Sequence, residues 1–187
     1  MNWSVTKMSN HVVIMNFDSE SKSYQAFLEI KQLHLEKKIK GEQMAILEHL
    51  PNHQLEPKQF LDFNGADKNM KGGLIGMLVG VLAGPLGVLL GWFTGSVIGS
   101  MQDAKEVTEA LSVFEHTVDV IHEGDTGVIL IADEEDNRYI NDLVFQKLGG
   151  QIVRLNTEDV EKEVADAKKT EQDLETEAKS RWFNRKA

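Results

Sequence analysis

The chain contains no cysteine among its 187 residues. This absence excludes disulfide bonds, thiolate metal sites and a cysteine nucleophile, and it fits a protein that works in a reducing compartment. Positive charge is scarce too, because 20 Lys and Arg stand against 30 Asp and Glu, for a formal net charge of −10. Nucleic-acid binding needs clustered cations that neutralise phosphates, so we expect no nucleic-acid partner.

The start of the chain, MNWSVTKMSN, lacks the apolar stretch of a secretory signal peptide. We therefore interpret residues 1–10 as a flexible leader. The soluble part of the protein is expected on the cytoplasmic side of the cell.

Charged residues are missing altogether from Gly72 to Gln102. Within this stretch glycine returns at every fourth position in two series separated by Pro85: Gly72, Gly76, Gly80 and Gly84, then Gly87, Gly91, Gly95 and Gly99. Glycine inside a helix costs about 1 kcal/mol relative to alanine, whereas in lipid small residues four apart let helix backbones approach closely. The pattern predicts a glycine-zipper helical hairpin over 72–101 that associates with a lipid bilayer and with other copies of itself.

The length of this stretch decides between a hairpin and a single span. As a helix, Gly72–Gly84 reaches about 20 Å, less than a hydrocarbon core of about 30 Å. One kinked helix over the whole stretch would reach about 45 Å, but it would put the two flanks on opposite sides of the membrane. We therefore favour a hairpin that turns at Pro85, either shallow or completed by oligomerisation. A buried hairpin in a soluble oligomer and a pore-forming assembly are the alternatives.

The sequence before the hairpin predicts one strand–helix–strand unit. His11–Asp18 (HVVIMNFD) has the composition of a buried strand, and apolar residues then recur at helical spacing from Ser19, a candidate cap, to about Lys38. Gly41 would end that helix, Glu42–Leu50 would form a second strand, and Lys58–Phe63 a short additional one.

The sequence after the hairpin repeats this order. Gly127–Ala132 (GVILIA) is the strongest strand signal in the chain, and Asp133 to Asp136 supply a capping cluster for a helix. Gly149 and Gly150 end that helix, and Gln151–Leu155 begins another strand. The helix is expected to present one apolar face, made of Tyr139, Ile140, Leu143, Val144 and Leu148.

These two halves predict an α+β fold, a ferredoxin-like sandwich with helices on one side of an antiparallel sheet. The inserted hairpin separates the halves, and a charged C-terminal helix follows them, which we interpret as solvated or weakly packed. The expected boundaries are 11–63 and 126–157 for the two halves, 72–101 for the hairpin, 103–121 for a connecting helix, and 158–187 for the charged helix and its basic, aromatic tail.

The combination of these features resembles one bacterial family, the predicted membrane proteins filed as domain of unknown function 1269. The likeness is carried by HVVIMNFD, the glycine series, TGVILIA (Thr126–Ala132) and GGQIVRL (Gly149–Leu155). It covers roughly His11 to Thr157, and its most distinctive part is the glycine zipper. The resemblance implies a membrane location and supplies no reaction, cofactor or catalytic residue.

The remaining candidate sites are weak. His49 and His53 have Pro51 between them, and His116 and His122 would diverge around a helix, so no histidine metal site is expected. The acidic run Asp133–Asp136 is explained by helix capping. We expect no catalytic residues, no metal and no cofactor, and the sequence does not define a small-molecule ligand.

Two aromatic regions are candidates for contact with a membrane surface. Trp92 lies within the second apolar arm of the hairpin. The tail KSRWFNRK places aromatic residues beside cations, a composition that suits anionic lipid headgroups; the residues concerned are Trp182, Phe183, Arg181, Arg185 and Lys186.

The sequence thus favours a membrane-associated, self-associating protein with a structural or regulatory role, related to the cell envelope or to stress. A soluble oligomeric sensor or small-ligand module of ferredoxin-like fold is the first alternative, and a pore-forming assembly is the second.

Overall fold

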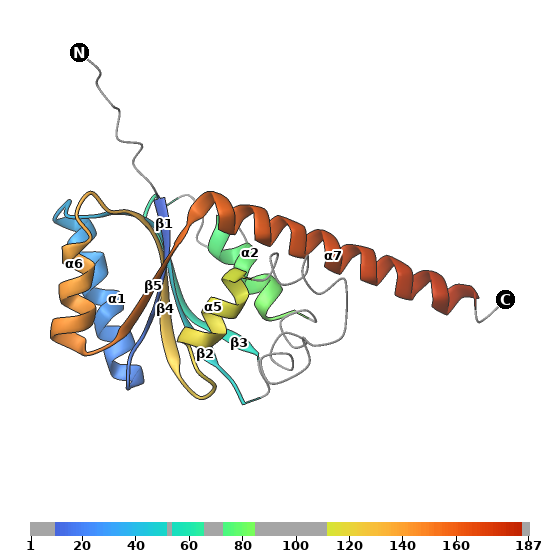
Figure 1. Ribbon diagram of the computed structural model, residues 1–187, viewed down its shortest axis with the longest axis horizontal. Coiled ribbons are helices and arrows are strands. Elements are labelled where there is room, and N and C mark those ends of the chain that lie inside the picture. The colour runs from blue at the N-terminus through green and yellow to red at the C-terminus, as the bar shows by residue number, and fades with distance from the viewer. Residues whose placement is uncertain (1–9, 52–53, 66–72, 85–111, 185–187) are drawn as a thin grey trace, which may run out of the picture.

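The computed structural model describes residues 10–51, 54–65, 73–84 and 112–184. These residues form an α+β fold around a five-stranded antiparallel sheet (Figure 1). The strands are β1 (Asn10–Asn16), β2 (Lys40–His49), β3 (Leu55–Asp62), β4 (Thr126–Asp133) and β5 (Gln151–Asn156). The helices are α1 (Glu20–Leu35), α2 (Gly73–Leu82), α5 (Ser112–Val120), α6 (Arg138–Asn141), the π-helical η1 (Asp142–Leu148) and α7 (Thr157–Asn184).

The strand order is β3-β2-β4-β1-β5, so the two halves of the chain are interleaved. β4 lies between β1 and β2, and β1 lies between β4 and β5, with every neighbouring pair antiparallel. Two strands that are each antiparallel to a third run parallel to one another. Each half is therefore a strand–helix–strand crossover whose two strands are separated by one strand from the other half.

Helices cover both faces of this sheet, which corrects the expectation that they lie on one side. Figure 1 shows α1 and α6 on one face and α2, α5 and α7 on the other. The first seven residues of β4, from Thr126 to Ala132, are all buried. Because successive side chains of a strand point to opposite faces, such a strand needs cover on both sides. The apolar run in β4 required a second helical layer, and α2, α5 and the first half of α7 supply it.

Each face of the sheet has its own hydrophobic core. The core under α1 and η1 contains Phe27 and Ile30 of α1, and Ile140, Val144 and Leu148 of the α6–η1 helix. The core on the other face is built around α2, in which six of the seven apolar side chains are no more than 7% exposed. This core includes the following residues of α5 and α7: Val113, Phe114, Val160, Val164 and Ala167.

The five predicted strands are present, and the helices differ from their predictions at their ends. The expected connecting helix over 103–121 is described only as α5, and the leader residues 1–9 lie outside the described residues. α1 ends at Leu35, before Gly41, and Lys37 turns the chain with a positive φ of 58°. Gly41 instead lies in β2, where a Cβ would press on the Phe63 ring. Ser19 precedes α1, but its side chain makes no capping hydrogen bond. Gly149 does end η1, in the left-handed conformation with φ of 69°.

The C-terminal helix also differs from its prediction. α7 runs for 28 residues, and in its first half Val160, Val164 and Ala167 are buried against the sheet. The expectation of a solvated or weakly packed helix outside the core was therefore wrong for this half. Its apolar residues are few but fall on one side, and β1 and β5 offer them a surface. The second half, with Leu174 49% exposed, does extend into solvent as predicted.

Candidate functional site

The glycine-rich helix α2 is the described part of the candidate zipper. Six of its seven apolar residues are buried in the protein, and Met77 is partly buried. The buried six are Leu74, Ile75, Leu78, Val79, Val81 and Leu82. Gly80 is exposed and Gly76 is partly exposed, so the glycines occupy the outer side of the helix. A Cβ placed on Gly80 would meet nothing within 4 Å. The outer side of α2 is thus open at Gly80, whereas its leucine and valine side is part of the core.

The start of α2 is fixed by a side chain from the sheet. Gln43 of β2 is 8% exposed, and its Oε1 accepts a hydrogen bond of 3.2 Å from the backbone N–H of Ile75. Gly73 adopts a φ of 76°, and a Cβ there would overlap the Gln43 side-chain amide. The first N–H groups of a helix have no partner within the helix, so Gln43 supplies a cap from a neighbouring strand. Sequence reasoning missed Gln43, because only the fold brings it to α2.

The end of α2 meets the C-terminal helix. A Cβ on Gly84 would lie 2.7 Å from Oε1 of Glu171 in α7. Gly84 therefore allows a side chain of α7 to approach closely. This contact lies within one chain, and it is not the contact between two helix backbones that the glycine spacing predicts. The other residues of the candidate zipper lie outside the residues that the structure describes: Gly72, Pro85, Gly87, Gly91, Gly95 and Gly99, together with Trp92.

The aromatic tail is described only in part. Trp182 and Phe183 are 55% and 66% exposed, and their rings meet edge to face at a centroid distance of 5.3 Å. Arg181 donates to Glu177 one turn earlier, at 2.6 Å. Arg185 and Lys186 lie outside the described residues. The structure thus leaves the two aromatic rings accessible at the far end of α7.

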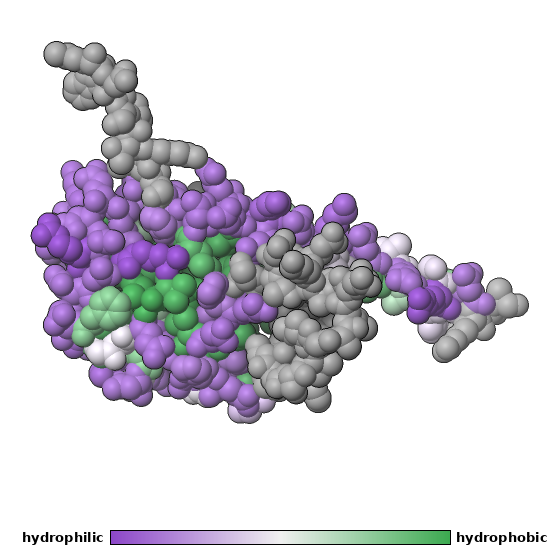
Figure 2. Space-filling view, in the orientation of Figure 1, coloured by the Kyte–Doolittle hydropathy of each residue, from purple (hydrophilic) through white to green (hydrophobic). Residues whose placement is uncertain are grey.

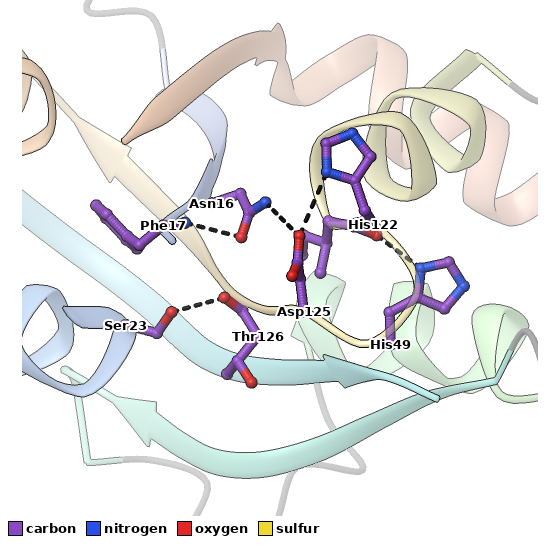
Figure 3. Close-up of polar contacts among 8 residues, drawn as sticks. Asn16, Phe17, Ser23, His49, His122, Asp125 and Thr126 are labelled. Atoms are coloured by element: carbon purple, nitrogen blue, oxygen red, sulfur yellow. Dashed lines mark hydrogen bonds and ion pairs between the residues drawn. The ribbon is translucent and has the colours of Figure 1, made fainter. Parts of the chain in front are cut away.

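A cluster of polar side chains lies where the loop after α5 enters β4 (Figure 3). Asn16 donates to Oδ2 of Asp125 at 3.0 Å, and Nδ1 of His122 lies 3.3 Å from the same oxygen. His49 is buried, and its Nδ1 lies 2.6 Å from the backbone oxygen of Ile121. Since a carbonyl oxygen only accepts, the His49 ring carries a proton on Nδ1. These contacts hold the loop against the ends of β1 and β2.

Backbone contacts complete this cluster. The N–H of His49 donates to the oxygen of Asp125 at 2.9 Å, and the N–H of Gly124 donates to the oxygen of His49 at 2.7 Å. The buried hydroxyl of Ser23 donates to the oxygen of Thr126 at 2.6 Å, which ties α1 to β4. The polar groups bond to one another and to the main chain, as expected for a structural cluster.

The acidic run before α6 has two separate roles. Asp136 precedes the N-cap residue Asn137 and accepts from the backbone N–H of Arg138, the first residue of α6, at 3.0 Å. Hydrogen bonds from the Arg138 guanidinium lower the pKa of Asp136. Glu134, whose side chain is only 1% exposed, receives two hydrogen bonds from Arg154 of β5, at 2.8 and 3.0 Å. The run was predicted as a capping cluster, and the ion pair of the buried Glu134 side chain with the partly buried Arg154 was not foreseen.

A groove of about 530 Å³ lies between α1 and the α6–η1 helix. Its rim is crossed by the ion pair of Lys147 with Glu29, at 2.7 Å. Desolvation is the largest single effect on the Glu29 carboxyl and raises its pKa. The hydrogen bonds from Lys147 and Gln25 together have a stronger effect, so the pKa of Glu29 is lowered. In the described part of the chain, no three His, Asp or Glu side chains gather as metal ligands.

The comparisons with known proteins return nothing for this chain. No protein-family model, no curated protein and no solved structure matches it. Among the helices that the structure describes, none is both long enough and apolar enough to cross a membrane. The resemblance to the family of predicted membrane proteins therefore stays a prediction from the sequence.

Proposed function

We propose that this protein is a self-associating structural or regulatory module that acts at a membrane and catalyses no reaction. The observation that carries this proposal is the orientation of α2, which turns its glycines outward and leaves open space at Gly80. An accessible face of small residues lets a second helix approach backbone to backbone. The charge-free sequence from Gly72 to Gln102 supports a lipid environment for the rest of this segment.

A ferredoxin-like core, with β3 added at one edge, is part of the proposal. Its support is the interleaving of two strand–helix–strand halves, in which β1 and β4 are central. The resemblance to the family filed as domain of unknown function 1269 is also consistent with it. We place the soluble domain on the cytoplasmic side, since a chain without cysteine suits a reducing compartment.

One observation favours a second candidate, a soluble oligomeric sensor or ligand-binding module. Every leucine and valine of α2 is buried in the core, so this arm presents no leucine or valine face to lipid. The glycine face would then join copies of the protein in water. The two candidates differ in what covers the charge-free residues after Gly84. Lipid would cover them in the membrane protein, and protein would cover them in the soluble oligomer.

Alkaline extraction of isolated membranes distinguishes these candidates. We expect the full chain to stay in the membrane pellet, with protease protection showing both termini on the same side. Quantitative release into the supernatant would refute the membrane proposal and leave the soluble oligomer.

The glycine face is tested by two substitutions at one position. Gly80→Ile should reduce crosslinked oligomer in detergent, because its bulk keeps the helix backbones apart. Gly80→Ala is the matched control and should retain most of the oligomer, since alanine still permits close packing. An unchanged or higher yield for Gly80→Ile would show that copies do not meet through this face.

A further inference from the structure

The far half of α7 projects beyond the body of the protein (Figure 1). The last buried residue of the helix is Ala167, and Glu171 makes a close approach at Gly84. After that point every described residue of α7 is exposed, including Leu174 at 49% and Trp182 at 55%. In Figure 2 this part of α7 extends past the body as a mixture of hydrophilic and hydrophobic residues.

The exposed half continues the face that packs on the sheet. Residues recur along α7 in alternating steps of four and three, and all of them are apolar or small except Glu171, which lies where the helix leaves the body. The residues are Val160, Val164, Ala167, Glu171, Leu174 and Ala178. This repeat keeps the residues on a single stripe that suits packing against another helix. Trp182 comes one turn after Ala178 and extends the stripe. The stripe is covered in the first half of α7 and uncovered in the second.

The charges along this segment indicate which occupant fits. Four acidic residues precede Ala178, namely Glu171, Asp173, Glu175 and Glu177, and two basic residues, Lys179 and Arg181, follow it. Two copies packed in parallel would set acid against acid. Lys179 and Arg181 pair with Glu175 and Glu177 of their own helix, at 3.8 and 2.6 Å. Two antiparallel copies also set this basic part of one helix against the acidic part of the other. The segment is therefore complementary to itself in one direction only.

We propose that residues 171–184 of α7 form a homodimer contact, in which two copies pack antiparallel about a two-fold axis at Ala178. In this arrangement Leu174 of one copy lies opposite Trp182 of the other, and the small Ala178 side chains meet at the axis. A two-fold contact uses the same residues on both copies, so each substitution acts twice. The segment is only about 20 Å long, so the dimer is weak and dissociates on dilution.

This contact adds to the proposed self-association through α2 but rests on different residues. The two are therefore distinguishable by experiment. Gly80→Ile should leave the α7 contact intact, and substitutions in α7 should leave contacts through the glycine face intact.

The native chain has no cysteine, so single cysteine variants report directly on the geometry. Under mild oxidation, Ala178→Cys should crosslink to itself, because helix axes about 8–10 Å apart bring the two Cα atoms within disulfide range. Leu174→Cys alone should crosslink poorly, since antiparallel copies separate these residues by about 12 Å along the axis. A mixture of Leu174→Cys and Trp182→Cys chains should give the mixed dimer.

A charge substitution tests the same contact without crosslinking. Ala178→Glu brings two carboxylates together at the axis and should weaken dimerisation roughly tenfold or more in sedimentation experiments at tens of micromolar protein. Ser180→Glu adds the same charge on the opposite side of the helix and should change it little. Helical circular dichroism of both variants controls for folding.

Three results would overturn the proposal. Efficient self-crosslinking of Leu174→Cys without the mixed product would indicate a parallel contact. Equal behaviour of Ala178→Glu and Ser180→Glu would show that this side of α7 joins no second copy. Binding of the chain to vesicles with an anionic lipid, abolished by Ala178→Glu while the protein is monomeric without them, would assign the stripe to a lipid surface.

Discussion

Gln43 shows how one polar side chain positions the glycine-rich helix. It lies in the middle of β2, is almost fully buried, and accepts a hydrogen bond from the N–H of Ile75. Gln43→Met keeps the length of the side chain but removes the acceptor, and it leaves a helix N–H without its partner. We expect the free energy of unfolding to fall by about 1–2 kcal/mol.

Urea denaturation followed by circular dichroism measures this loss. Gln59→Met on β3 makes the same chemical change at an exposed position and should alter stability by less than about 0.5 kcal/mol. Equal effects of the two substitutions would mean that Gln43 does not support α2.

The ion pair of Arg154 and Glu134 is a second residue whose role depends on burial. Arg154→Leu would leave the carboxylate of Glu134, 1% exposed, without its cation. We expect a loss of about 3 kcal/mol, because removing one partner of a buried pair strands the other charge. The double variant with Glu134→Leu should lose clearly less than the sum of the two single variants.

Denaturant unfolding of the two single variants and the double variant gives the coupling free energy. Asn141, whose Oδ1 accepts from Arg154 at 2.8 Å, stays unchanged in all of them. Additive losses would show that the two side chains stabilise the fold independently.

At the scale of single elements, α7 combines two different environments. Val164 is fully buried, whereas Leu174 is half exposed. In dilute protein, Val164→Ala should destabilise the fold by about 2 kcal/mol through the cavity it leaves. Leu174→Ala should cost less than about 0.5 kcal/mol. Thermal unfolding below the concentration at which copies associate measures both.

A comparable loss of stability in these two variants would contradict the division of α7 at Ala167.

The sequence pattern shows the apolar stripe of α7 but not where the stripe is covered. That point is set by the end of α2, where Glu171 meets Gly84. The prediction of a solvated or weakly packed helix was wrong for the first half of α7, because a thin apolar stripe is enough to join the core when a sheet lies beneath it.

At the scale of the whole molecule, the sheet order predicts a gradient of stability. β1, β2 and β4 are paired on both sides, whereas β3 and β5 lie at the edges. Amide hydrogen exchange should be slowest in β1, β2 and β4 and on the order of tenfold faster or more for the outward-facing amides of β3 and β5. Slowest exchange in an edge strand would indicate that another chain covers that edge.

The sequence by itself determined the strands, the order of the elements and the glycine spacing, because period, composition and turn residues are local properties. It determined neither the second helical layer nor the partners of Gln43 and Glu134. Those depend on which strands become neighbours, and the interleaving of the two halves joins residues far apart in the chain. The side of α2 that faces inward was likewise decided by tertiary structure. An apolar helix with a glycine stripe can bury its leucines in lipid or in protein, and here they are buried against the sheet of the same protein.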